Sequence, residues 1–170
     1  GFLKNDLIQA DGHVIHFLKK MGVRFQKNSK QIKMKGPFQL KGGSFSLKAC
    51  PDLVPIMSVL AMFAKGKTRL YGISHARAKE SDRIYDLKKE LEKVGAKIIA
   101  KSDEMTIIPQ ENYKSNCVLN PHNDHRLAMA FSVLGLKVGI KVKNIECCAK
   151  SYPSFVRDFK ALGARASKQK

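Results

Sequence analysis

A dense group of charged side chains of both signs stands at the start of an amphipathic helix that the sequence predicts over residues 81–94. The group comprises Arg77, Lys79, Glu80, Asp82 and Arg83, all within seven residues. Helix starts carry free N–H groups that attract anions, and an arginine can hold a phosphate or carboxylate through two parallel hydrogen bonds. Neighbouring carboxylates can orient such cations and move protons. The group therefore indicates a site for anionic ligands beside groups capable of proton transfer.

Further charged groups stand at the starts of other expected helices. Asp52 precedes an apolar helix expected over 53–64, and Lys150 precedes a helix expected over 153–162. The start of another apolar helix, over 124–136, carries four polar residues in a row: Asn123, Asp124, His125 and Arg126. Basic groups thus recur at several helix starts, which favours one anion-binding face built from distant parts of the chain.

Each of these residues also has a purely structural explanation. Short polar side chains often cap the free N–H groups of a helix, and the candidates here are Asp52, Ser81, Asn123 and Asp124. Glu80 could form surface ion pairs of little energetic worth. His125 could be a buried imidazole with satisfied nitrogens. For any single residue the structural explanation is favoured, whereas the recurrence of four cations favours binding.

An internal repeat makes these helix starts equivalent. The segments FLKKMGVRFQ, ELEKVGAKII and DFKALGARAS each end a helix at a glycine and continue into a basic segment typical of a strand. The glycines are Gly22, Gly95 and Gly163, at intervals of 73 and 68 residues. Asp52 and Asp124 lie 72 residues apart, each opening an apolar helix. The unit reads strand, apolar helix, strand, amphipathic helix and two strands.

The sequence predicts a partial repeat over 1–43, a complete one over 44–112 and a partial one over 113–170. The expected helices cover 5–21, 53–64, 81–94, 124–136 and 153–162, and the expected strands cover 23–28, 31–35, 44–49, 67–72, 96–101, 104–108, 115–119 and 139–144. Because the first repeat lacks its leading half and the third lacks its closing strands, we expect the chain to begin in mid-repeat. A missing segment would then close the lobe.

The expected helices are of two kinds. In 81–94 one apolar stripe consists of Ile84, Leu87, Leu91 and Val94, and the residues expected outside it are Lys88, Lys89, Glu90 and Lys93. That pattern is typical of a surface helix. The helices over 53–64 and 127–136 are apolar nearly all round, so we expect them to be buried, with short Lys-rich strands turning one face to water. The predicted fold is an inside-out α/β (α+β) lobe of repeated βαβαββ units around buried helices.

The net charge of +18 favours anionic partners, such as nucleic acid, acidic lipid or phosphorylated small molecules. The lysines are scattered, and the sequence has no zinc-finger spacing or aromatic RNA-binding signature. The longest apolar run is too short to span a bilayer. The cysteines form no C-x-x-C pair and fit reduced thiols of a cytoplasmic protein. The histidines show no metal-ligand spacing, so neither a metal nor a cofactor is expected.

Four segments, in order, resemble the 5-enolpyruvylshikimate-3-phosphate synthase family. ARAKESDRI resembles its R-x-K-E-[ST]-D-R motif, and NDHRLAMAFSVLGL resembles its N-D-H-R-M-A-M motif. CPDLVPIMSVLAMFAKGKTRL and CAKSYPSFVRDFKALG resemble two further blocks. Four ordered blocks are far more specific than one short motif. The resemblance covers essentially the whole chain as the family's C-terminal lobe, which in the family is an inside-out lobe of three repeats.

The resemblance implies transfer of the enolpyruvyl group from phosphoenolpyruvate to the 5-hydroxyl of shikimate 3-phosphate, releasing phosphate, in the shikimate pathway of aromatic amino acid biosynthesis. The implied catalytic residues are Asp52, which would take the proton from the hydroxyl, and Glu80, which would exchange a proton at the methylene carbon. The implied shikimate 3-phosphate contacts are Asp52, His75 and Lys79. The implied phosphoenolpyruvate contacts are Arg83, Arg126 and Lys150. The implied supporting residues are Asp82 and Asp124, which would steer the arginines, and His125.

The chain departs from the family pattern at three positions. His75 stands where the family usually has Asn, and the milder departures are Ala78 and Leu127. A larger difference is that no residues resemble the family's N-terminal lobe, which supplies much of the shikimate 3-phosphate site. We therefore expect the chain alone to be inactive and to bind both substrates weakly.

Three other functions compete with this one. The nearest is the enolpyruvyl transferase of the same fold that acts on UDP-N-acetylglucosamine, which carries a different sequence where this chain has KESDR. The net charge suggests a nucleic-acid-binding module, although the resemblance implies neither a nucleic acid nor a membrane as partner. The repeats alone would also fit a non-catalytic scaffold.

Overall fold

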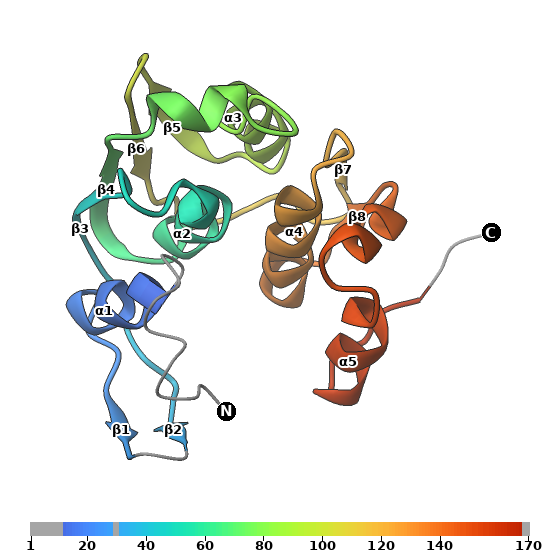
Figure 1. Ribbon diagram of the computed structural model, residues 1–170, viewed down its shortest axis with the longest axis horizontal. Coiled ribbons are helices and arrows are strands. Elements are labelled where there is room, and N and C mark those ends of the chain that lie inside the picture. Colours follow the sequence, from blue (N-terminus) through green and yellow to red (C-terminus); the bar gives the residue numbers. More distant parts are fainter. Residues whose placement is uncertain (1–11, 29–30, 168–170) are drawn as a thin grey trace.

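The structure, a computed structural model, describes residues 12–28 and 31–167 (Figure 1). Its helices are α1 (His13–Lys20), α2 (Val54–Met62), α3 (Tyr85–Lys93), α4 (His125–Val138) and α5 (Phe155–Ala161). Its strands are β1 (Phe25–Lys27), β2 (Ile32–Met34), β3 (Lys41–Ser46), β4 (Lys65–Tyr71), β5 (Lys97–Ala100), β6 (Glu104–Ile108), β7 (Val118–Leu119) and β8 (Lys141–Val142). Its 3₁₀ turns are η3 (Pro51–Leu53), η4 (Ser74–Ala78) and η5 (Ile145–Lys150).

The middle repeat follows the order β3, α2, β4, α3, β5, β6. Its sheet has the strand order β3–β4–β6–β5, in which β3 and β4 are parallel and the other neighbours are antiparallel. A parallel pair needs a crossover connection, and α2 supplies it. The third repeat begins the same way, with α4 between the parallel strands β7 and β8, and the first contributes α1 and the hairpin β1–β2. The predicted βαβαββ order is confirmed.

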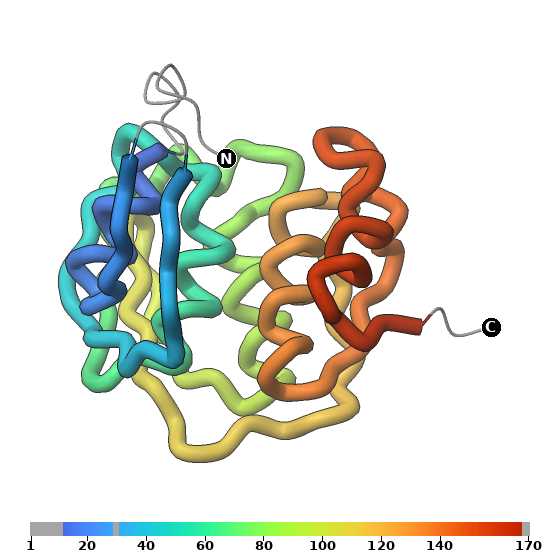
Figure 2. The backbone as a smooth tube through the Cα atoms, turned by 90° about the horizontal axis from the view of Figure 1, so that it is seen from below, coloured from blue at the N-terminus to red at the C-terminus, as the bar shows by residue number. Residues whose placement is uncertain are grey.

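The helices α2 and α4 form the centre of the core. They pack side by side, as both views show (Figures 1 and 2). Of the nine residues of α2, only Ile56 and Leu60 are not fully buried. From α4 the core receives Leu127, Phe131 and Leu134, among others. The prediction that the two apolar helices are buried is confirmed, and their burial contributes to the hydrophobic stabilisation of the lobe.

The helix α3 carries the predicted apolar stripe, with one error in the prediction. The four stripe residues are fully buried. Glu90, expected outside the stripe, is 1% exposed. It lies three residues after Leu87 and four before Val94, so it borders the stripe on the helix surface. The burial of its charge is compensated by polar partners, of which Lys93 Nζ lies 2.6 Å from the carboxylate.

The first turn of α3 also differs from the prediction, since the helix begins at Tyr85 rather than at residue 81. Asp82 Oδ1 accepts hydrogen bonds from the N–H groups of Ile84 (3.0 Å) and Tyr85 (2.9 Å), which places the start of the helix after it. Ser81, a predicted cap, instead donates from its hydroxyl to Asp124. The charged group at 77–83 therefore lies in η4 and the loop that follows it.

Other predicted bounds agree approximately. The segment between Lys150 and α5 is longer than expected, because α5 begins at Phe155. The strands β7 and β8 have only two residues each. Part of the helix predicted over 5–21 falls at 5–11, outside the described residues.

The part of the chain that the structure describes contains no helix of sufficient length and apolar character to cross a membrane. No disulfide joins the cysteines among these residues, and Cys50 and Cys148 are buried. Burial raises the pKa of the Cys148 thiol to about 12, so this thiol stays protonated near neutral pH.

Candidate active site

The candidate site lies where the starts of the two core helices meet the loop before α3. Asp52 belongs to η3, directly before α2, and Asp124 to Arg126 form the start of α4. Because α2 and α4 pack side by side, Arg126 Nη2 comes within 2.8 Å of Asp52 Oδ2. The repeat therefore brings together charged residues from equivalent helix starts.

The loop that carries Lys79, Glu80 and Arg83 is held from the outside by Arg77. The Arg77 guanidinium donates to Asp82 Oδ2 (2.9 Å) and to the carbonyl oxygens of Lys101 (2.9 Å) and Ser102 (3.2 Å). The two carbonyls belong to the turn between β5 and β6. This contact ties the loop to the edge of the sheet.

Arg83 is the buried centre of the site, with its side chain 2% exposed. Its Nε donates to Asp124 Oδ2 (2.7 Å), and its Nη2 donates to Asp124 Oδ1 (3.2 Å). Its Nη1 donates to Asp52 Oδ1 (2.6 Å), and Glu80 Oε2 lies 3.5 Å from Nη2. Burial opposes the charge of Arg83, but hydrogen bonds and attraction from Asp124 and Asp52 outweigh it and raise the pKa of the guanidinium.

Asp124 is fully buried, and both of its carboxylate oxygens accept hydrogen bonds. Oδ1 accepts from the N–H groups of Arg126 (2.8 Å) and Leu127 (3.4 Å), which makes it the N-cap of α4. Oδ2 accepts from Ser81 Oγ (3.0 Å) as well as from Arg83. Burial by itself would raise the pKa of this carboxyl. The contacts with Arg83 have a larger opposite effect, so the pKa lies below its usual value.

Asp52 is the more open carboxylate, with its side chain 30% exposed. It contacts three cations: Arg83 (2.6 Å), Arg126 (2.8 Å) and Lys79 (3.7 Å). Burial raises its pKa, but Arg126, Arg83 and Lys79 together lower it below its usual value. In this arrangement Asp52 is ionised near neutral pH and is a weak base.

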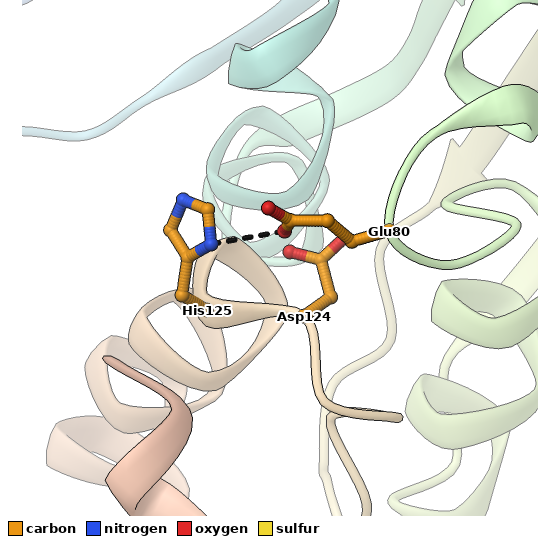
Figure 3. Close-up of side chains that lie close together, drawn as sticks. All are labelled: Glu80, Asp124 and His125. Atoms are coloured by element: carbon orange, nitrogen blue, oxygen red, sulfur yellow. Dashed lines mark ion pairs between the residues drawn. The ribbon is translucent and has the colours of Figure 1, made fainter. Parts of the chain in front are cut away.

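The side chains of Glu80 and His125 point toward one another (Figure 3). Glu80 Oε2 lies 2.9 Å from His125 Nδ1, and the Glu80 side chain is 39% exposed, whereas that of His125 is 10% exposed. Lys150, at the end of η5, donates from Nζ to the carbonyl oxygen of Asn123 (3.0 Å). That bond brings the fourth cation to the start of α4.

Glu80, Asp124 and His125 offer ligand atoms that all lie within 4.8 Å of one another, a spacing that a metal ion could use. Both oxygens of Asp124 already accept hydrogen bonds from Arg83, and a metal ion would have to displace that guanidinium. The donors around Asp124 therefore fit an arginine site better than a metal site.

The structure brings together seven of the predicted site residues through direct contacts: Asp52, Lys79, Glu80, Arg83, Asp124, His125 and Arg126. Lys150 joins them through Asn123. His75 lies exposed in η4, and none of the hydrogen bonds and ion pairs found across residues 12–28 and 31–167 involves it. Asp82 pairs with Arg77 and supports the start of α3, rather than steering Arg83 or Arg126 as predicted.

Sequence reasoning missed two residues that support the site, Glu90 and His122. Glu90 Oε2 accepts from the N–H of Asn120 (2.8 Å), and Oε1 lies 3.2 Å from His122 Nε2. The available signal was the place of Glu90 beside the apolar stripe of α3. No local pattern marks its partners, which lie 30 and 32 residues further along the chain.

Comparison with known proteins identifies the family. The sequence model for EPSP synthase (3-phosphoshikimate 1-carboxyvinyltransferase) matches residues 3–159. The chain belongs to the EPSP synthase family. Within it, a 3-phosphoshikimate 1-carboxyvinyltransferase of Clostridium kluyveri is 37% identical over 163 residues, and one of Methanococcus aeolicus is 39% identical over 158 residues. These matches cover 95% and 92% of this chain, but only 38% and 36% of the relatives.

Solved structures agree with the family. The EPSP synthase of Acinetobacter baumannii superposes with a TM-score of 0.74 and 28% identity, over 87% of this chain and 38% of that protein. The enolpyruvyl transferase NikO of Streptomyces tendae superposes with a TM-score of 0.74 and 20% identity, over 91% of this chain and 35% of that protein, which supports the fold alone. The inside-out α/β fold is thus confirmed, and the chain spans little more than a third of its relatives.

Proposed function

We propose that this chain is the C-terminal lobe of an enzyme that transfers the enolpyruvyl group from phosphoenolpyruvate to the 5-hydroxyl of shikimate 3-phosphate and releases phosphate. The observation that carries the proposal is the convergence of Lys79, Arg83 and Arg126 on Asp52. Both substrates are anions, and a wall of cations can bind them and stabilise the leaving phosphate. The repeat bounds 1–43, 44–112 and 113–170 are part of this proposal.

Arg126 and Lys150 are the cations that can meet phosphoenolpyruvate directly. The side chain of Arg126 is 28% exposed, and Lys150 is exposed as well. Arg83 is 2% exposed and surrounded by three carboxylates, so its contact with phosphoenolpyruvate requires Asp52 or Glu80 to move aside. Without substrate, these carboxylates occupy the cations that the substrate anions would take. That competition weakens binding by the lobe alone.

An exchange of partners would also make Asp52 a stronger base. Arg126, Arg83 and Lys79 all lower its pKa. When phosphoenolpyruvate engages Arg126 and shikimate 3-phosphate engages Lys79, those cations are partly neutralised. The pKa of Asp52 then rises towards its ordinary value, and its carboxylate can take the proton from the 5-hydroxyl as that oxygen attacks phosphoenolpyruvate.

Glu80 is the proposed acid and base at the methylene carbon. It is the most exposed of the three carboxylates that contact Arg83, so it can reach a substrate in the opening. Glu80 Oε2 lies 2.9 Å from His125 Nδ1 without hydrogen-bond geometry, so a protonated imidazole would attract the carboxylate. Asp124 holds Arg83 in place, and Asp82 supports the loop through Arg77. We include His75 as a shikimate 3-phosphate contact, because its exposed side chain is available to a ligand.

The lobe needs a second half to work. The chain spans 38% of the Clostridium kluyveri relative, and the side chains of Arg126 and Asp52 are 28% and 30% exposed, so other groups can reach them. We infer that the partner is the N-terminal lobe of the same kind of enzyme and that the substrates bind between the lobes. By itself the 170-residue chain is expected to be inactive.

Two other functions remain as outcomes of the test. A lobe specific for UDP-N-acetylglucosamine would have the same fold, and a basic module would bind nucleic acid with a steep dependence on salt.

The test combines the chain with the part of the Clostridium kluyveri relative that it does not match, and assays phosphate release from phosphoenolpyruvate. We expect release with shikimate 3-phosphate, none with UDP-N-acetylglucosamine, and none from either part alone. Arg126→Ala should abolish release, whereas the matched change Arg157→Ala, at an exposed arginine of α5, should not. Release driven by UDP-N-acetylglucosamine, or full turnover by the chain alone, would contradict the proposal.

A further inference from the structure

The proposed reaction does not explain why the carboxylate of Glu90 is buried. The residue is 1% exposed, and its carboxylate contacts Lys93 and the segment 120–122. A buried charge is costly unless it is paired and hydrogen-bonded. Burial by itself would raise the pKa of Glu90. Hydrogen bonds from Lys93, Asn120 and His122 have a larger opposite effect, so the pKa is lowered and the group is ionised near neutral pH.

Glu90 forms hydrogen bonds with the segment 120–123, a tight turn with an unusual backbone conformation. His122 and Asn123 have φ angles of 52° and 59°, in the left-handed region that non-glycine residues seldom adopt. The His122 N–H donates to Asn120 Oδ1 (2.9 Å), and the Asp124 N–H donates to the Pro121 carbonyl (2.9 Å). Two successive left-handed residues persist only where the surroundings hold them. Glu90 supplies such a constraint from α3.

This turn leads directly into the residues of the site. The Asn123 carbonyl accepts from Lys150, and Asp124 binds Arg83. Arg126 contacts Asp52 one turn further along the chain. The turn is therefore fixed to the loop before α3 at one end, through Arg83 and Asp124, and to α3 itself at the other end, through Glu90.

We propose that Glu90 is a positioning residue for phosphoenolpyruvate binding, because its carboxylate holds the left-handed turn 120–123 that sets the places of Lys150 and Arg126. His122 is its partner in this role. The proposal deepens the function proposed above and rests on it. It does not make Glu90 catalytic, since Glu90 touches none of the residues assigned to proton transfer.

Two measurements test it. In the assembled enzyme, Glu90→Ala is expected to raise KM for phosphoenolpyruvate by about 10- to 100-fold with a smaller change in KM for shikimate 3-phosphate, as expected when binding groups are misplaced. In the 170-residue chain, deuterium uptake by a peptide covering 118–127 is expected to rise about fivefold or more, because the turn opens locally. Glu90→Gln keeps an oxygen for the Asn120 N–H and is expected to give smaller changes in both.

Two controls separate positioning from general stability. Lys93→Ala removes the ion pair of Glu90 and leaves the turn contacts, so it should lower the melting temperature and change both readouts less than Glu90→Ala does. Leu87→Ala weakens the packing of α3 and removes no hydrogen bond to the turn, so it should lower the melting temperature without a selective rise in KM. If Glu90→Ala does not fold, the proposal requires Glu90→Gln to raise KM for phosphoenolpyruvate and deuterium uptake more than Lys93→Ala does.

Unchanged uptake over 118–127, or a rise in KM for phosphoenolpyruvate that Leu87→Ala matches, would overturn the proposal. The two proposals fail in different ways. If the unsubstituted assembly releases no phosphate with shikimate 3-phosphate, the proposed function fails, and deuterium uptake alone still decides whether Glu90 holds the turn.

Discussion

Asp52 and Asp124 lie 72 residues apart, and each brings a carboxylate to the start of a buried helix. Both bind the same guanidinium, that of Arg83, at 2.6 and 2.7 Å. Their surroundings nevertheless differ. Asp124 is fully buried, caps α4 and accepts hydrogen bonds at both oxygens, whereas the side chain of Asp52 is 30% exposed and bridges cations without capping α2.

The two equivalent helix starts therefore differ in role: Asp124 supports the site, and Asp52 is the carboxylate that can react. In the closed surroundings of Asp124, any loss of a partner leaves a buried charge without compensation. In the open surroundings of Asp52, solvent or a substrate can replace one partner by another at small cost. The carboxylate suited to a changing protonation state is therefore Asp52, and Asp124 is suited to holding Arg83 still.

The largest effect should come from Asp124→Ala. The change removes the cap of α4 and leaves Arg83 buried with fewer partners, which should lower the free energy of unfolding by about 3–5 kcal/mol. Asp52→Ala should cost only about 1 kcal/mol, because Arg83 keeps its bonds to Asp124. Urea unfolding of both variants measures the difference. Equal losses would remove the distinction between the two carboxylates.

Arg83→Lys should have the next largest effect. An ammonium group cannot reproduce the bonds that Nε, Nη1 and Nη2 make to Asp124 and Asp52, so we expect a loss of about 2–3 kcal/mol. The matched change Arg69→Lys, at an arginine that is 50% exposed and paired with Glu104, should cost less than about 0.5 kcal/mol. A stability like that of the unsubstituted chain in Arg83→Lys would contradict the buried pairing.

Acid should weaken the lobe in part through Asp124. Its pKa is lower in the folded chain, because the contacts with Arg83 outweigh the opposing effect of burial. The unfolded chain then takes up the proton first, so this stabilisation is present above the unfolded pKa of about 3.9 and is lost as the pH falls through it towards the folded pKa. Asp124→Asn should therefore flatten the fall in unfolding free energy below about pH 4 more than Asp52→Asn does. The opposite order would reverse the comparison.

The smallest change in stability is expected for Lys150→Ala. Lys150 is exposed and makes one bond, to the carbonyl of Asn123, so the free energy of unfolding should change by less than about 0.5 kcal/mol. KM for phosphoenolpyruvate in the assembled enzyme should still rise about tenfold, which corresponds to the loss of one charged contact. Lys160→Ala, at an exposed lysine of α5, is the matched control and should leave KM unchanged.

Much of the fold could be predicted because it depends on local patterns. The all-round apolar character of 53–64 and 127–136 predicted the buried α2 and α4, and the stripe from Ile84 to Val94 predicted α3. The repeat then implied that Asp52 and Asp124 stand at equivalent helix starts. The convergence of the site followed from that equivalence.

The roles within the site could not be predicted in the same way, because they depend on contacts across the chain. Asp52 and Asp124 resemble each other in sequence, and their exposure differs only through their three-dimensional neighbours. Ser81 was a plausible helix cap from the sequence, but in the structure its hydroxyl donates to Asp124 instead. Glu90 was placed on the wrong side of α3, since no local pattern could reveal the Asn120 and His122 groups that compensate its burial.

The most direct test is the turnover of Asp52→Asn in the enzyme assembled with the unmatched part of the Clostridium kluyveri relative. We expect kcat for phosphate release with shikimate 3-phosphate to fall about 1000-fold, as expected for loss of a general base. The unfolding free energy should change by less than about 1 kcal/mol, because Arg83 keeps its bonds to Asp124. Turnover within a few fold of the unsubstituted enzyme would contradict the assignment of Asp52 as the reacting carboxylate.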